Sequence, residues 1–101
     1  MHGLTRQAAA ELAPLNIQVN AIAPGYIDTA LATYPDAMVT AMLATSPTPR
    51  RGRAAEVAGL AAFLASADSD LVTGTVIPLD GGVTSSVLID APPWHANFGA
   101  V

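Results

Sequence analysis

The chain of 101 residues contains no cysteine and no lysine, and only 12% of its residues are charged. Without cysteine, disulfide bonds and thiolate chemistry are excluded, which fits a cytoplasmic protein. Without lysine, and with a formal net charge of −4, the chain lacks the basic side chains that neutralise phosphates on nucleic acids or anionic membranes. We therefore expect a cytoplasmic protein that binds neither nucleic acid nor membrane.

Long apolar runs are also lacking, since no stretch approaches the roughly 18 uninterrupted apolar residues of a membrane-spanning helix. The first twelve residues have no extended apolar core, so we do not expect a signal peptide. Apolar residues nevertheless make up 51% of the chain, and a domain of this length buries only about 60–70% of its unfolded surface. We expect one small domain, part of whose surface is covered by further protein.

The hydrophobic periodicity predicts the order helix, strand, helix, helix, strand, followed by an irregular tail. The expected helices cover residues 2–13, 34–44 and 54–66, and the expected strands cover residues 17–23 and 75–79. Residues 46–53 contain two prolines and are predicted to be an extended linker. Pro78 cannot donate a backbone hydrogen bond, so the second strand is expected at an edge. Two parallel strands joined by a helical crossover are typical of a layered α/β fold.

The stretch from Ile17 to Thr29, IQVNAIAPGYIDT, is the most informative part of the chain. Its apolar run breaks at Pro24-Gly25 and continues into polar residues. Because open α/β sheets bind ligands beyond the carboxyl ends of their strands, we expect this strand end to form one wall of a ligand site. Just before this stretch, Asn16 suits a left-handed turn. Within the stretch, Asn20 is expected to satisfy nearby backbone groups.

A family resemblance emerges from these residues. The stretch HGLTRQAAAELAPLNIQVNAIAPGYIDT resembles the second half of a short-chain dehydrogenase/reductase. Further motifs of that family follow in order: P-x-x-R-x-G-x-x-x-E-[IV]-A from Pro47 to Ala58, then FLAS, VTG and LDGG. The resemblance implies the carboxyl-terminal part of a Rossmann-like, doubly wound parallel sheet. Residues 1–82 would then belong to the NAD(P)-binding domain, and residues 83–101 would form a carboxyl-terminal tail.

The same resemblance implies an NAD(P)-dependent oxidoreductase acting on a secondary alcohol or ketone, with NAD or NADP as cofactor. The implied cofactor-binding residues are Pro24, Gly25, Ile27 and Thr29. The backbone of Ile27 and the hydroxyl of Thr29 would contact the nicotinamide carboxamide, and such groups suit an amide. The resemblance also implies a homo-oligomer, formed through the helix at residues 54–66 and the strand at residues 75–79.

Several motifs of this family are missing from the chain. There is no glycine-rich cofactor loop after a first strand, and no serine takes the catalytic place. The Y-x-x-x-K motif is absent too, because Tyr26 and Tyr34 are followed four residues later by Ala30 and Met38. We therefore expect a carboxyl-terminal fragment that carries no catalytic residue and is inactive by itself. The alternative is a non-catalytic truncated remnant that retains only an oligomerisation surface.

Other polar clusters leave alternatives open. The three arginines of residues 50–53 could grip a phosphate, or Arg50 could fix its own loop by hydrogen bonds. Asp68 and Asp70 are expected in a solvated turn rather than a cation site. His2 and His95 lie far apart in the sequence, with no cysteine and no H-E-x-x-H motif, so we expect no zinc site. The tail side chains Trp94, His95 and Phe98 could cap a neighbouring subunit's site or fold back on their own domain.

Overall fold

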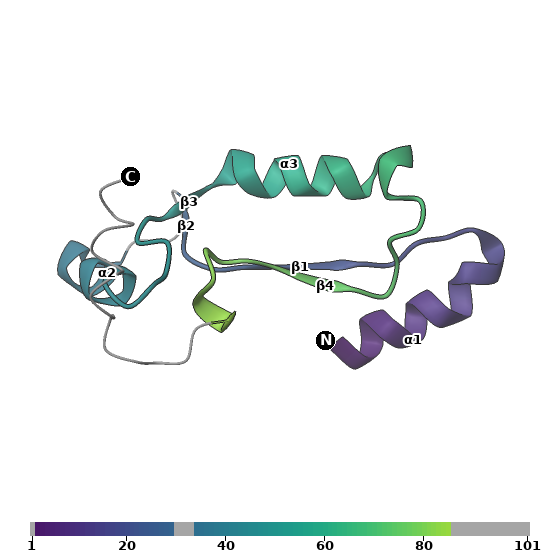
Figure 1. Ribbon diagram of the computed structural model, residues 1–101, viewed down its shortest axis with the longest axis horizontal. Coiled ribbons are helices and arrows are strands. Elements are labelled where there is room, and N and C mark those ends of the chain that lie inside the picture. Colours follow the sequence, from purple (N-terminus) through teal and green to yellow (C-terminus); the bar gives the residue numbers. More distant parts are fainter. Residues whose placement is uncertain (1, 30–33, 86–101) are drawn as a thin grey trace. The chain divides into compact units, whose positions relative to one another are not determined.

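The computed structural model describes residues 2–29 and 34–85 (Figure 1). The chain divides into two compact units, and each is described by itself. The first unit comprises Met1–Pro24 and Ala55–Leu79, and the second comprises Gly25–Ala54 and Asp80–Val101. The tail residues Trp94, His95 and Phe98 lie outside the described residues, and the domain boundary expected at residue 82 stays a prediction.

The first unit is built on a pair of parallel strands. β1 (Ala21–Pro24) pairs with β4 (Val76–Leu79), and the register sets Ala21 opposite Val76 and Pro24 opposite Leu79. α1 (His2–Leu12) and α3 (Ala54–Leu64) lie on opposite sides of this pair (Figure 1). Parallel strands flanked by helices on both sides are the arrangement expected of a layered α/β fold.

The end of α1 differs by one residue from the sequence-based expectation. The helix ends at Leu12, and Ala13–Leu15 form a 3₁₀ turn that includes Pro14. Proline is tolerated there because the first residues of a helical turn need no backbone donor. Asn16 then adopts the left-handed conformation, with φ 59° and ψ 37°, and its N–H donates to the Ala13 carbonyl at 2.9 Å. The predicted left-handed turn at Asn16 is confirmed.

The predicted strand at residues 17–23 is wrong at both ends, since β1 begins at Ala21 and includes Pro24. Before Ala21, the segment is held by side-chain amides together with a backbone hydrogen bond from the Gly74 N–H to the Val19 carbonyl at 2.8 Å. The Asn20 Nδ2 donates to the Val72 carbonyl at 2.9 Å, and its Oδ1 accepts from the Thr75 N–H at 3.3 Å. Asn20 therefore satisfies backbone groups beside the strand, as predicted.

Gln18 reinforces the same junction. Its Nε2 donates to the carbonyl of Ser69 and, at 2.8 Å, to that of Val72. The backbone ladder takes over at Ala21, whose N–H donates to the Thr75 carbonyl at 3.0 Å. Periodicity could not reveal this boundary because amide side chains and a β-ladder satisfy the same backbone groups.

β4 begins one residue later than expected, at Val76. Pro78 stands opposite Ala23 of β1. Within residues 2–29 and 34–85, β1 is the only strand that pairs with β4. This pairing suits a strand that contains proline, because its missing N–H can face away from the ladder.

The second unit contains two short strands that the periodicity did not predict. β2 (Ile27–Asp28) pairs in parallel with β3 (Gly52–Arg53), with Ile27 opposite Gly52. The prediction that residues 46–53 form only an extended linker is therefore wrong at its end. Gly52 suits the pairing, because a Cβ there would lie 2.7 Å from the Ile27 Cδ1 and would require Ile27 to rotate. The Gly52 N–H donates to the Tyr26 carbonyl at 2.7 Å.

The helix of the second unit is short. α2 (Asp36–Leu43) follows Pro35, which precedes its first turn without a side-chain capping bond. Val39 is its buried residue, while Met38 is 42% exposed. A 3₁₀ turn, Val83–Ser85, closes the described part of this unit.

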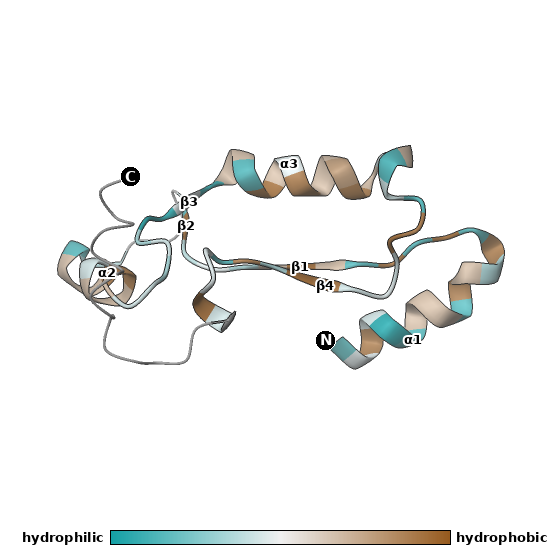
Figure 2. Ribbon diagram, in the orientation of Figure 1, coloured by the Kyte–Doolittle hydropathy of each residue, from teal (hydrophilic) through white to brown (hydrophobic). Residues whose placement is uncertain are grey.

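Little of the described chain is buried. Ala9 and Val39 are its only buried apolar residues, and the buried polar residues are Thr5, Ser46 and Ser69. Apart from Glu56 in its first turn, α3 consists of glycine and apolar residues (Figure 2), yet none of its residues is buried. Such exposure agrees with the expectation that further protein covers part of the surface.

Candidate functional site

In the second unit, three loops meet where the sequence predicts the wall of a ligand site. Gly25 lies so close to Asp80 that an added Cβ would be 2.8 Å from the Asp80 Cβ and 2.9 Å from its Cα. The Thr48 N–H donates to the Gly81 carbonyl at 3.1 Å. The turn at Gly25, the loop at Thr48 and the turn at Asp80-Gly81 therefore pack together.

Asp80 organises the last of these turns. Its Oδ1 accepts from the Gly82 N–H at 2.9 Å, and its Oδ2 accepts from the Thr84 hydroxyl at 2.7 Å and the Thr84 N–H at 3.2 Å. The Thr84 hydroxyl is the largest cause, followed by the Gly82 N–H, of a pKa for Asp80 below its ordinary value of 3.8. The carboxylate thereby caps the 3₁₀ turn Val83–Ser85.

This lowered pKa makes part of the stability pH-dependent. Because the pKa of Asp80 is lower in the folded state, its contribution is present above the unfolded pKa and is lost as the pH falls through the folded value. Between pH 7 and pH 2, the urea concentration at the midpoint of unfolding should fall less for Asp80→Asn than for the unaltered chain. Thr84→Ser keeps the hydroxyl and should behave as the unaltered chain. Equal pH dependence of Asp80→Asn and the unaltered chain would contradict this role.

A serine hydroxyl within the loop before β3 stabilises the conformation of that loop. The Ser46 side chain is 2% exposed, and its Oγ donates to the Thr48 carbonyl at 2.8 Å. The Arg50 N–H donates to the same carbonyl at 2.8 Å, and the Arg50 Nη1 donates to the Arg51 carbonyl at 3.1 Å. Of the two roles left open for Arg50, these contacts favour the fixing of its own loop.

The predicted cofactor-binding residues occupy the ends of two strands. Pro24 is the last residue of β1, in the first unit. Gly25, Ile27 and Thr29 belong to the second unit, where Ile27 is half-buried in β2 and Thr29 is exposed. The β2–β3 pairing holds Ile27 and brings Thr29 just beyond the strand end. Backbone groups and a hydroxyl at this position are the donor set that suits a carboxamide.

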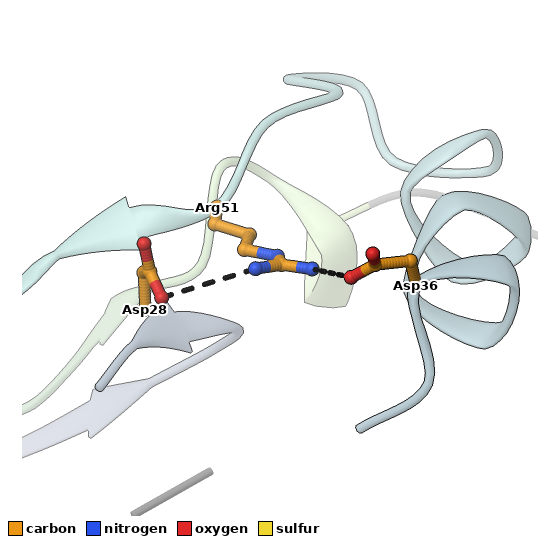
Figure 3. Close-up of polar contacts among 3 residues, drawn as sticks. All are labelled: Asp28, Asp36 and Arg51. Atoms are coloured by element: carbon orange, nitrogen blue, oxygen red, sulfur yellow. Dashed lines mark ion pairs between the residues drawn. The ribbon is translucent and has the colours of Figure 1, made fainter. Parts of the chain in front are cut away.

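Arg51 makes contacts that the sequence did not predict. Its Nη1 lies 3.8 Å from the Asp28 Oδ1, and its Nη2 lies 3.6 Å from the Asp36 Oδ1 (Figure 3). The sequence shows Arg51 only as one of the three arginines of residues 50–53, far along the chain from Asp28 and Asp36. The β2–β3 register had to be known before Arg51 could be placed beside Asp28.

Asp68 and Asp70 lie at a turn of the first unit. Asp68 lies in the 3₁₀ turn Ala67–Ser69, and Asp70 follows it, as expected of a turn. Within the ranges 2–29 and 34–85, no three His, Asp or Glu side chains are grouped to hold a metal ion. No helix in the same ranges has the length and apolar character needed to cross a membrane.

Comparison with known proteins identifies the family. The sequence model for the family described as enoyl-(acyl carrier protein) reductase matches residues 1–84 of this chain. The chain belongs to the short-chain dehydrogenase/reductase family. The family resemblance found in the sequence motifs is thereby confirmed.

Relatives of this short-chain dehydrogenase/reductase share its sequence and fold. The 3-oxoacyl-[acyl-carrier-protein] reductase MabA of Mycobacterium tuberculosis is 44% identical over 82 residues, covering 80% of this chain and 33% of that protein. A putative short-chain alcohol dehydrogenase from Sinorhizobium meliloti superposes with a TM-score of 0.78 at 43% identity, covering 85% of this chain and 35% of that chain. A 4-hydroxyisoleucine dehydrogenase complexed with NADH has a TM-score of 0.77 at 28% identity, with 85% and 37% covered.

These likenesses confirm the α/β fold with parallel strands that the family's Rossmann-like sheet requires. The chain spans about a third of the length of the curated relatives that it matches, 33% of the Mycobacterium tuberculosis protein. The activity of a whole protein of this family is therefore a proposal for this chain.

Proposed function

We propose that this chain forms the nicotinamide-facing wall of an NAD(P)-dependent oxidoreductase that interconverts a secondary alcohol and a ketone. One observation carries the proposal: the β2–β3 pair holds Ile27 and presents Thr29 at a strand end. Ligands of open α/β sheets bind at such ends. Membership of a family of NAD(P)-dependent oxidoreductases supports the choice of cofactor, either NAD or NADP.

Each of the four proposed cofactor-binding residues has a separate task. Pro24 ends β1, and Gly25 lets the chain pass close to Asp80. The backbone of Ile27 and the hydroxyl of Thr29 orient the carboxamide, which fixes the face that the ring presents. When bound, the reduced nicotinamide would supply a hydride to the carbonyl carbon of a ketone, and the oxidised nicotinamide would accept one from the carbinol carbon of an alcohol.

The acid of this reaction is not supplied by this chain. The sequence contains no lysine and no Y-x-x-x-K motif, so the chain lacks the tyrosine and lysine that would supply the acid in this family. We propose that the chain alone neither binds the dinucleotide measurably nor reduces ketones. Micromolar NADH binding in a fluorescence titration of the purified chain would overturn that part of the proposal. We also propose the cytoplasm as its location, on the absence of cysteine.

A chimaera tests the positive part of the proposal. Residues 2–82 replace the matched segment of the Mycobacterium tuberculosis relative, to which the chain is 44% identical over 82 residues. We expect the chimaera to bind NAD(P)H and reduce a ketone. Thr29→Val should weaken cofactor binding by about two- to twelvefold, the effect of one net hydrogen bond. Thr29→Ser retains the hydroxyl and should bind normally.

The outcomes of the chimaera separate two failures. A folded chimaera without cofactor affinity would overturn the proposed wall. Unchanged affinity in Thr29→Val would overturn the role of Thr29 alone. Both results are read from the fluorescence of NADH and of NADPH, independently of the choice of ketone.

A second candidate is a non-catalytic chain that retains an oligomerisation surface made by α3 and β4. The exposed apolar side chains of the first unit favour it, because Phe63 in α3 is 43% exposed and Leu71 is 98% exposed. Sedimentation of the purified chain tests the second candidate, which a monomer contradicts. Cofactor affinity of the folded chimaera separates the two candidates, because the first requires it and the second does not.

A further inference from the structure

We propose that Arg51 is a positioning residue that clasps the first turn of α2 to the end of β2. Its guanidinium faces two carboxylates at once: the Asp28 Oδ1 at 3.8 Å from Nη1 and the Asp36 Oδ1 at 3.6 Å from Nη2 (Figure 3). Asp28 is the last residue of β2, and Asp36 is the first residue of α2. One side chain therefore connects two elements that are separated by seven residues of sequence.

α2 needs an external anchor. It has only eight residues, whereas isolated helices shorter than about 12–15 residues are marginal in water. Val39 is its one buried residue, and Pro35 offers no side-chain cap to its first turn. The first-turn amides of Met38 and Val39 both donate to the Pro35 carbonyl, at 3.0 and 3.1 Å. Fraying at Asp36 would expose these hydrogen bonds first.

Arginine suits this position better than lysine. The planar guanidinium presents diverging N–H groups, so Nη1 and Nη2 can serve different carboxylates, whereas an ammonium is a single point charge. The backbone beside Arg51 is held, because Gly52 pairs with Ile27 in the β2–β3 ladder. The Arg51 side chain is also only 38% exposed, compared with 67% for Asp28 and 99% for Asp36.

The attraction in this clasp is Coulombic. Both N···O distances exceed those of a hydrogen bond, and both carboxylates are exposed. Salt therefore screens the contact, and about 1 M salt shortens the Debye length to roughly 3 Å, less than the separation of the charges. The anchoring of α2 should vary with ionic strength.

The clasp also bears on the cofactor wall, and this step rests on the proposed function. Asp28 lies between Ile27 and Thr29, the two residues proposed to contact the carboxamide. By restraining Asp28, Arg51 restrains the strand end that presents them. The start of α2 and the cofactor wall are thereby coupled through one side chain.

Hydrogen exchange of the full chain, without cofactor, tests the clasp. At low ionic strength, Arg51→Gln should speed amide exchange in residues 36–43 by about two- to fivefold, the range that exposed ion pairs give. The exchange rate of these residues in Arg51→Lys should lie between the rates in Arg51→Gln and in the unaltered chain. Addition of 1 M NaCl should bring the unaltered chain to the rate of Arg51→Gln, and Asp36→Asn should add nothing to Arg51→Gln.

Arg6→Gln is the matched control, because it removes the same charge from α1 in the first unit and should leave residues 36–43 unchanged. Equal low-salt exchange of Arg51→Gln and the unaltered chain would overturn the clasp. So would exchange in the unaltered chain that is insensitive to salt, or additive effects of Arg51→Gln and Asp36→Asn. These rates need no cofactor, so loss of the clasp and loss of the proposed cofactor wall are separate results.

Discussion

Gly81→Ala is expected to lower the free energy of unfolding by about 2–5 kcal/mol, the sum of two penalties. Gly81 has a φ of +66°, a left-handed conformation that costs an L-residue roughly 1–2 kcal/mol. An added Cβ would also lie 2.9 Å from the Thr48 Cβ and 3.4 Å from the Thr48 carbonyl oxygen. Relief would require the loop at Thr48 to move, and that loop donates its N–H to the Gly81 carbonyl.

Urea unfolding followed by circular dichroism measures this effect. Gly59→Ala is the matched control, because Gly59 lies inside α3 and an added Cβ there meets nothing within 4 Å. That control should gain about 0.5–1 kcal/mol, the usual difference between glycine and alanine in a helix. If Gly81→Ala proves as stable as the unaltered chain, the described contact between Gly81 and Thr48 is wrong.

Gly25→Ala is expected to cost roughly 1–3 kcal/mol, the range for overpacking a filled site. This cost arises from a clash between the added Cβ and Asp80 rather than from the backbone conformation of Gly25, whose φ is not positive. The added Cβ would be 2.9 Å from the Asp80 Cα, which belongs to the backbone and cannot rotate away. Asp80 is further held by the three hydrogen bonds that its carboxylate accepts from Gly82 and Thr84.

Gly52→Ala provides the comparison for Gly25→Ala. A Cβ at Gly52 would lie 2.7 Å from the Ile27 Cδ1, the far end of a flexible side chain. A rotation of Ile27 can relieve that contact, so Gly52→Ala should cost less than Gly25→Ala in the same unfolding experiment. The reverse order would show that Gly25 and Asp80 are not in close backbone contact.

The local signals in the sequence were reliable where one residue governs the outcome. Asn16 takes the left-handed conformation, as its short polar side chain allows. The apolar periodicity located α1, α2 and α3 to within a few residues. The ordered series of short motifs also identified the family, because each motif reflects a local turn or strand end.

The pairings between distant segments could not be predicted in the same way. The β2–β3 ladder joins Ile27 with Gly52 across 24 intervening residues, and two-residue strands leave no periodic pattern. The linker prediction for residues 46–53 was therefore wrong at Gly52–Arg53. The start of β1 was also misplaced, because the residues before Ala21 are held largely by the side-chain amides of Gln18 and Asn20 rather than by strand pairing.

By itself, the sequence determined the family and the order of the three helices and of strands β1 and β4. Those properties depend on residue type and spacing along one segment. Only the tertiary structure decided that Gly25 packs against Asp80 and that Arg51 lies between Asp28 and Asp36. Such contacts depend on the registers in which separate segments meet, and a register is set by the packing of the whole unit rather than by either segment alone.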